Sequence, residues 1–374
     1  MSGRALRLGS LPPLRVSPGT VIMVLVLAVL MYPALERVSE IPSRAILLAI
    51  GVGGFLVLSV LVHEAAHALI ARAFGARVEH IALTLWGGHT QYRGGPRGGI
   101  GSILISLAGP VSNLLLAALT FAITALATDP GTPAALFWGF CSWLNLALAL
   151  FNLLPGLPMD GGRALEALLG SILRRPTVGT RVTAWIGRGL AIAVVLVPLW
   201  RAARGHASMT GQLLTIVWAV LIASLLWSGA SRALEGARVQ ERAERLDAGD
   251  LLRSMLICAP QTPLGQLPAQ VDPEQVLVVD LAPDPAAPGS LGRAYRLDTG
   301  ALAAVPAPRR EATAVSAIAM PIGPVRSLPG DLAGDALLSA MLDAPAPVYL
   351  VREADGSVRG VIMSADVNAR LRGR

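Results

Sequence analysis

The segment from residue 45 to residue 71 restricts the fold of this chain more than any other. No charged residue occurs from Ala45 to Val62, and the pattern His63-Glu64-Ala65-Ala66-His67 follows before a second apolar run. On an α-helix, two histidines four residues apart project from one face, which is the spacing that one zinc ion requires. Because His and Glu are costly to place in lipid, their presence in so apolar a segment predicts a metal site in a membrane helix.

The composition favours a membrane location. Hydrophobic residues make up 53% of the 374 residues and charged residues 15%, with a mean hydropathy of +0.60. An average soluble protein carries about 25% charged residues. The net charge of +7 comes from arginine alone, since the chain has no lysine. These arginines form no patch interleaved with aromatic residues, so we expect no nucleic-acid partner. The histidine motif also occurs by chance on soluble helices, but this composition argues against that interpretation.

Six apolar stretches are long enough, or nearly so, to cross a ~30 Å hydrocarbon layer, which takes about 20 helical residues. They lie at residues 19–36, 45–70, 102–127, 134–154, 184–201 and 211–229. Arginine is more frequent in the segments that are internal if the N-terminus is cytoplasmic, which predicts that both termini are cytoplasmic. We therefore expect a multi-pass protein of the cell's inner membrane. On this topology His63 lies about 26 Å into the second span, just beneath the cytoplasmic face.

Residues 73–101, between the second and third spans, are too few and too polar to cross. Hydrophobic residues alternate loosely at Val78, Ile81 and Leu83, and glycine-rich turns follow. This pattern predicts a small strand pair at the membrane surface, whose unpaired edge would accept an extended peptide. His89 lies in this segment, and its role stays open because a lone loop histidine usually faces solvent. His206 is expected in an outer loop, on the opposite side from the site.

A catalytic zinc site usually has three protein ligands, so two histidines leave it one short. After the fourth span, residues 151–163 form an apolar helix end followed by prolines and glycines, with Asp160 as the only acid. Asp160 is a candidate third ligand, and the alternative is an N-cap for the next helix. Asn145 and Asn152 share one face of the fourth span. Asn152 would either donate to an oxyanion or bond a neighbouring helix, and the sequence does not decide between these roles.

These motifs together resemble the site-2 protease family of intramembrane zinc metalloproteases, over residues 20–230. The resemblance rests on three patterns, which are His63-Glu64-x-x-His67, Ala108-Gly109-Pro110-x-x-Asn113 and Asn152-x-x-Pro155-x-x-x-x-Asp160-Gly161. It implies that His63, His67 and Asp160 bind one Zn²⁺ per chain. It also implies that Glu64 acts as base and then as acid, and that Asn152 assists near the scissile bond. The family cuts single-span membrane proteins, such as anti-sigma factors and membrane-held transcription regulators.

The C-terminal third has a different character, with a charged connector followed by a region rich in Pro and Asp. Two β-rich runs around Asp355-Gly356 predict a hairpin, preceded by a helix-like run at 336–342 and followed by a helix from Ser364. This pattern resembles one cystathionine-β-synthase (CBS) repeat at about residues 312–374. Residues 250–305 resemble a weaker copy.

CBS pairs commonly bind adenine nucleotides, with a hydroxyl residue three positions before an Asp that contacts the ribose. Asp366 is present here, but Met363 occupies the hydroxyl position. The resemblance therefore leaves adenine nucleotide binding in doubt. It does imply a gating or interaction role for the pair, and a homodimer formed through it.

The sequence thus predicts an α-helical polytopic membrane protein with about six transmembrane helices, a small membrane-surface β element and a cytoplasmic α/β CBS-like C-terminal domain. Its expected parts are a cytoplasmic tail (1–18), a transmembrane zinc metalloprotease domain (19–230), a linker helix (231–249) and the CBS-like pair (250–374). The expected function is intramembrane hydrolysis of single-span proteins in the lipid bilayer. Two alternatives are a CBS-regulated membrane transporter and a catalytically silent membrane scaffold.

Overall fold

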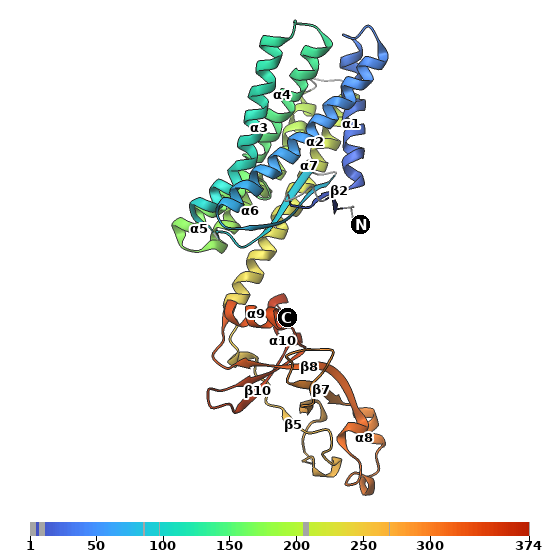
Figure 1. Cartoon of the computed structure of the whole chain (residues 1–374), viewed down its shortest axis with the longest axis vertical. Helices are drawn as coiled ribbons and strands as arrows, with labels where there is room; N and C mark the ends of the chain where they lie inside the picture. The colour runs from blue at the N-terminus through green and yellow to red at the C-terminus, as the bar shows by residue number, and fades with distance from the viewer. Residues whose placement is uncertain are drawn as a thin grey trace. The chain divides into compact units, whose positions relative to one another are not determined.

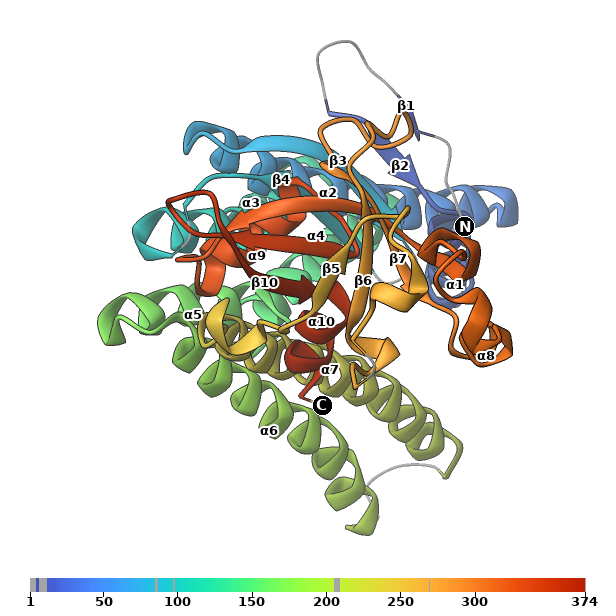
Figure 2. The same cartoon turned by 90° about the horizontal axis from the view of Figure 1, so that it is seen from below.

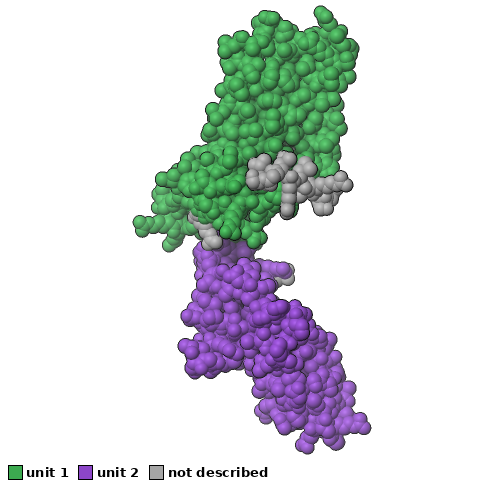
Figure 3. Space-filling model, viewed as in Figure 1, with its two compact units in different colours: residues 1–237 green, residues 238–374 purple. Residues whose placement is uncertain are grey.

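The computed structural model describes residues 5–6, 12–84, 87–96, 98–204, 209–268 and 270–373. The chain divides into two compact units, Met1–Ala237 and Arg238–Arg374, which Figure 3 shows in different colours. This division falls inside the predicted linker, residues 231–249. His206 and much of the predicted N-terminal tail lie outside the described residues.

The first unit is built from long apolar helices. Among the described residues, six helices are long and apolar enough to span a membrane, which confirms the expected multi-pass membrane protein. They are α1 (Pro18–Glu36), α2 (Pro42–Ala73), α3 (Gly99–Ala127), α4 (Pro133–Asn152), α6 (Pro176–Ala203) and α7 (Met209–Glu244). Four of them begin with proline, a residue that suits the first turn because the N–H it lacks would have no helical partner there.

Helix α3 holds the first unit together. It packs against α2, α4 and the short helix α5 (Asp160–Leu173), and α5 packs against α6. Helices α1 to α4 run alongside one another, and α5 lies at one end of them (Figure 1). Small residues permit close approach: a Cβ built at Gly53 of α2 would lie 2.9 Å from the Val24 carbonyl oxygen of α1.

A four-stranded sheet lies at the same end of the helices as α5 (Figure 1). Its strands, in spatial order, are β1 (Ala5–Leu6), β2 (Leu14–Val16), β3 (Arg77–Thr84) and β4 (Gly87–Arg93). The antiparallel pairing of β3 with β4 confirms the predicted strand pair. The sequence did not indicate β1 and β2, because strands of two and three residues are too short to show an alternating pattern. Strand β2 runs parallel to β3, with Leu14 opposite Ile81.

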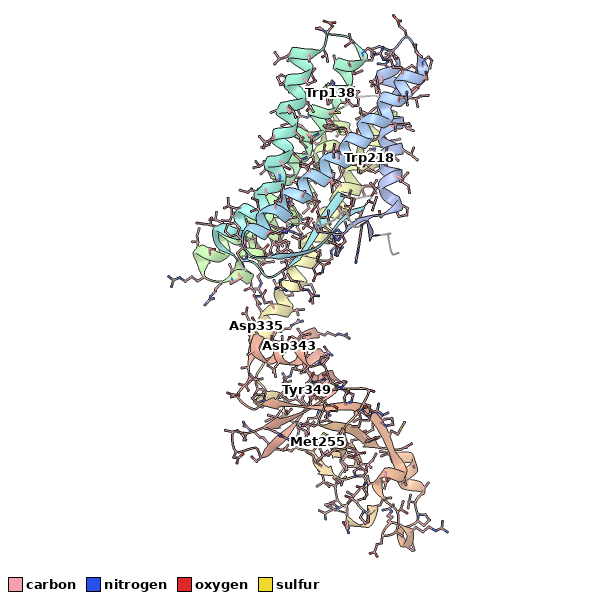
Figure 4. The ribbon with its side chains drawn as sticks, in the orientation of Figure 1. Trp138, Trp218, Met255, Asp335, Asp343 and Tyr349 are labelled. Atoms are coloured by element: carbon pink, nitrogen blue, oxygen red, sulfur yellow. The ribbon has the colours of Figure 1, made fainter. Side chains whose placement is uncertain are left out.

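The second unit is an α/β domain with one mixed sheet. Its strands, in spatial order, are β10 (Val358–Met363), β9 (Val348–Arg352), β8 (Ala319–Pro329), β7 (Gly292–Leu297), β6 (Val276–Asp280) and β5 (Leu256–Cys258). Its helices are α8 (Thr299–Ala304), α9 (Gly334–Asp343) and α10 (Ser364–Arg372). Strands β9 and β10 form the predicted hairpin, flanked by α9 and α10 as expected. The buried Tyr349 of β9 anchors this part, since its hydroxyl accepts the Ala346 N–H at 2.8 Å (Figure 4).

The strand arrangement of the second unit repeats once. Strand β5 is parallel to β6, which is antiparallel to β7, and β8, β9 and β10 repeat this order. A full helix, α9, joins β8 to β9, whereas short 3₁₀ turns are the helical structure described between β5 and β6. The missing helix explains why the second copy is clearer in the sequence.

Asp366, the candidate ribose ligand, is already paired within the second unit. The Arg253 guanidinium donates to both of its carboxylate oxygens, from Nε at 2.7 Å and from Nη2 at 2.5 Å. A ribose hydroxyl would have to compete with this bidentate pair, which is the stronger kind of hydrogen-bonded contact.

Candidate metal centre

The two histidines of the motif lie side by side on α2, one turn apart. Their rings are perpendicular, with centroids 4.7 Å apart, and their Nε2 atoms are separated by 3.1 Å. Both residues are buried, at 6% and 8% exposure. The four-residue spacing therefore brings both Nε2 atoms close together in the interior of the first unit.

Asp160, which lies 97 residues after His63 in the sequence, is close to both Nε2 atoms. Its Oδ2 lies 3.1 Å from His63 Nε2 and 3.4 Å from His67 Nε2. Among the described residues, these three side chains are the one group of His, Cys, Asp or Glu close enough to hold an ion. Asp160 is the first residue of α5, and Met159 occupies the N-cap position, where no side-chain capping bond forms. The carboxylate is therefore directed at the histidines rather than used as a cap.

Backbone packing fixes the loop that carries Asp160. Residues 153–159 connect α4 to α5, and the Leu157 N–H donates to the Thr183 carbonyl of α6 at 3.1 Å. A Cβ at Gly161, Gly162 or Gly187 would overlap the backbone of this loop. The prolines and glycines of the segment thus let the loop lie directly against α5 and α6, which sets the position of the carboxylate.

A directed chain of hydrogen bonds sets the proton position on His63. The Asn145 amide nitrogen donates to the Cys141 carbonyl at 2.8 Å, so the Asn145 oxygen accepts from Asn113 at 3.0 Å. The oxygen of Asn113 then lies 2.5 Å from His63 Nδ1. Because a carbonyl only accepts, it fixes the orientation of both amides, and His63 Nδ1 must be the donor.

His67 is oriented in the same way by a backbone group. Its Nδ1 lies 2.6 Å from the Ile105 carbonyl oxygen of α3, which can only accept. Both histidines therefore carry a proton on Nδ1, and in its neutral form each ring presents an Nε2 lone pair to Asp160.

This donor set fits a zinc ion. With neutral rings, two Nε2 lone pairs and a carboxylate oxygen face one another, an arrangement that a cation stabilises. Ligands in a tetrahedral zinc site, at about 2.0–2.2 Å from the metal, are separated by roughly 3.3–3.6 Å. The observed separations are 3.1, 3.1 and 3.4 Å. Gly109 of α3 leaves room for an ion beside the histidines, because a Cβ at this position would lie 2.5 Å from His63 Nε2.

Glu64 is buried next to this group and is held by β4. The Thr90 hydroxyl lies 2.8 Å from Glu64 Oε2 and 3.0 Å from the Glu64 carbonyl oxygen. A Cβ at Gly88 would lie 2.5 Å from Glu64 Cγ and 2.8 Å from Oε1. Glycine at this position therefore permits β4 to lie against the helix that carries the motif.

The three candidate ligands line one cavity of about 580 Å³ together with Glu64 and Asn152. Strand β4 forms one wall through residues 87–92, and apolar side chains from α2, α3, α4 and α7 form the others. The apolar residues are Val60, Ile105, Leu148, Phe151 and Leu225. The cavity therefore combines a polar centre with walls that suit an apolar peptide segment.

The two asparagines of α4 have different surroundings. Asn145 is fully buried and belongs to the hydrogen-bond chain that ends on His63. Asn152 lines the cavity, and its amide makes no hydrogen bond within the described part of the chain. Of the two, Asn152 is thus the one available to a bound peptide.

Three further residues lie at or near this cavity. His89 lines the cavity but is exposed and lies against His80, with ring centroids 6.0 Å apart, and it is not part of the ligand group. Arg163, one turn after Asp160, lines the cavity and was not singled out from the sequence. Thr90 was also missed, because a threonine in a short strand carries no signal of its contact with Glu64.

Comparisons with known proteins point to one family of peptidases. The family model for Peptidase M50B-like proteins matches residues 20–156, and the model for Peptidase family M50 matches residues 131–196. Rip3 of Mycobacterium tuberculosis, named as a zinc metalloprotease, is 35% identical over 224 residues, covering 58% of this chain and 53% of Rip3. The chain thus spans about half the length of this relative.

Two solved structures show partial similarity to this chain. The site-2 protease from Methanocaldococcus jannaschii shares 25% identity, with a TM-score of 0.41 over 62% of this chain and 95% of that one. The CBS domain of a bacterial CNNM/CorC family Mg²⁺ transporter shares 14% identity, with a TM-score of 0.26 over 45% of this chain and 98% of that one.

A further relative is matched over a larger share of its own length. YwhC of Bacillus subtilis, also named as a zinc metalloprotease, is 33% identical over 173 residues, which cover 38% of this chain and 77% of YwhC. A match that includes over three quarters of a relative at this identity establishes kinship. Together with the two family models, it shows that this chain belongs to peptidase family M50.

Proposed function

We propose that this chain is an intramembrane zinc endopeptidase that hydrolyses peptide bonds within or near the transmembrane helices of single-span membrane proteins. The observation that carries the proposal is the convergence of His63 Nε2, His67 Nε2 and Asp160 Oδ2 beside Glu64. These three atoms would hold one zinc ion per chain. When bound, zinc supplies Lewis-acid chemistry, which polarises a carbonyl and makes water acidic near neutral pH.

Glu64 is placed to move the proton. Its Oε2 accepts from Thr90, while Oε1 has no hydrogen-bond partner in the described part of the chain. Glu64 therefore takes a proton from the attacking water through its unpaired oxygen and returns it to the leaving amine. Gly88 leaves the space beside this oxygen open.

Asn152 is proposed to assist the reaction. Its amide group lines the cavity with its donors unused by described residues. A preorganised N–H donor of this kind stabilises the negative charge that develops on the carbonyl oxygen during hydrolysis. Asn152 would therefore hold either that oxygen or the neighbouring substrate backbone.

The substrate must enter in an extended form, because a helical peptide bond is shielded by its own hydrogen bonds. Strand β4 pairs with β3 on one side, and no described strand pairs with its other side. Its residues 87–92 line the cavity beside Glu64. We propose that an unwound substrate segment adds to this edge as a further strand, which would bring its backbone to the metal centre.

The proposed orientation follows the arginine distribution. It places both termini and the sheet at the cytoplasmic face of the inner membrane. Water then reaches the centre over a short polar path. The second unit is proposed to be a CBS-like pair that gates the protease or forms a homodimer. The Arg253–Asp366 pair argues against adenine nucleotide binding there.

The proposal is tested with purified full-length protein in liposomes that also contain a single-span substrate. Glu64→Gln should retain one zinc per chain but lose at least about a hundredfold in cleavage rate, because the general base is removed. Glu36→Gln, an exposed acid at the far end of α1, is the matched control and should cleave normally. Undiminished cleavage by Glu64→Gln would refute the assignment.

The same preparation separates the two alternatives. A transporter would move ions or solutes across the liposome membrane, and this transport would persist in Glu64→Gln. A silent scaffold would neither cleave nor transport in the wild type. Zinc analysis of the wild type, with one ion per chain expected, completes the test.

A further inference from the structure

Arg188 is a cation inside a membrane helix that the hydrolytic site does not use. It lies on α6, 13 residues before Arg201, and the intervening residues carry no charge. That separation corresponds to about 20 Å of helix, which is shorter than a ~30 Å hydrocarbon layer. If Arg201 lies at the outer interface, Arg188 lies within the hydrocarbon, about 10 Å short of its inner edge, where a charge without a counter-ion is costly.

The protein neutralises this cation only in part. The Arg188 guanidinium lies 4.9 Å from the Trp185 ring centroid and 4.7 Å from that of Trp227, and its Nη2 donates to the Ser231 hydroxyl at 3.1 Å. No carboxylate of the described residues pairs with it, and its Nε is buried without a partner. Two aromatic faces and a hydroxyl supply no negative charge, so the guanidinium retains donors for an anion. The residue is partly exposed, which leaves it within reach from outside.

An apolar groove begins at this cation and follows the two helices away from it. Helices α6 and α7 lie side by side (Figure 2), and the groove between them has a volume of about 470 Å³. The lining residues recur at spacings of three or four positions on each helix. They are Ala191, Ile192, Val195 and Leu196 of α6, and Val220, Ala223, Ser224 and Trp227 of α7. Because 188, 191, 192 and 195 lie on one face of α6, the cation and the groove are continuous.

We propose that this groove binds one anionic phospholipid. The phosphate would accept hydrogen bonds from the free guanidinium N–H groups of Arg188, and one acyl chain would lie in the groove. Trp185 and Trp227 are 61% and 44% exposed, and such amphipathic rings prefer the level of lipid headgroups. The single cation favours a phospholipid over a peptide helix, which would bring an apolar side chain and no charge to this position.

The test measures lipid retention by delipidated full-length protein, using native mass spectrometry. The probes are phosphatidylglycerol and phosphatidylcholine with identical acyl chains. We expect the wild type to prefer phosphatidylglycerol, and Arg188→Gln to lose about tenfold or more in affinity for it. Arg175→Gln removes an exposed cation just before the same helix and should bind as the wild type does. Arg188→Lys, which keeps the charge, should keep the preference.

A second variant tests the acyl-chain part of the site. Ser224 is exposed and lines the groove, so Ser224→Trp fills the groove without altering a buried position. It should lose affinity for long-chain phosphatidylglycerol but keep its affinity for the dihexanoyl form.

Four results would overturn the proposal. The first is that Arg188→Gln binds phosphatidylglycerol as well as the wild type does, and the second is that the wild type binds both headgroups equally. The third is that inorganic phosphate alone displaces the lipid. The fourth is that a substrate helix crosslinks at position 224 and phosphatidylglycerol does not displace it. The last result would assign the groove to the substrate.

Discussion

Gly109→Ala should remove zinc from the protein without unfolding it. A methyl group at this position of α3 would lie 2.5 Å from His63 Nε2, about 0.9 Å short of an ordinary 3.4 Å contact. Helix α3 cannot move away freely, since α2, α4 and α5 all pack against it. The imidazoles must therefore shift by nearly 1 Å, and a displacement of that size costs roughly a hundredfold in activity.

The matched control is Gly54→Ala on α2, the helix that carries both histidines. A Cβ at Gly54 meets no atom within 4 Å. Alanine at this helical position should be neutral or stabilising by up to about 1 kcal/mol. Zinc content by plasma mass spectrometry and cleavage in liposomes are measured for both variants. Full zinc occupancy and normal cleavage by Gly109→Ala would show that the space beside the Nε2 atoms is not the metal site.

Two further predictions concern groups that support a site rather than form it. Asn113→Leu removes the acceptor of His63 Nδ1 and should weaken zinc binding by about 10- to 100-fold in a chelator competition. Asn113→Asp is the control, because it keeps the acceptor oxygen. Equal losses of zinc affinity in both variants would contradict the assignment of the proton to Nδ1. For the second unit, calorimetric titration of the full chain with ATP should show no saturable binding, because Arg253 occupies both oxygens of Asp366. Saturable binding that Asp366→Asn abolishes would refute that reasoning.

The helices and the ligand motif could be predicted from the sequence because each depends on local information. Long apolar runs bounded by proline or glycine define the spans, and the four-residue spacing alone places His63 and His67 on one face. Asp160 was ambiguous on local chemistry, since an acid at the start of a helix is equally suited to capping. Its direction toward the histidines depends on backbone packing of residues 153–159 against α6, which no local pattern reports.

The supporting contacts could not be predicted for the same reason. Asn113 and Asn145 were visible as polar residues in apolar helices, but their link to His63 requires the register between α2, α3 and α4. The pairing of β2 with β3 joins residues over 60 positions apart through a strand of three residues. The place of Arg188 between Trp185 and Trp227 depends on the packing of α6 against α7, which no local pattern reports.

X-ray absorption at the zinc K-edge, recorded on the purified full chain, tests the central claim most directly. The account predicts one zinc per chain bound by two imidazole nitrogens and by oxygen, with no sulfur, and loss of the ion in Asp160→Asn. Sulfur ligation, or a spectrum that is unchanged in Asp160→Asn, would contradict it.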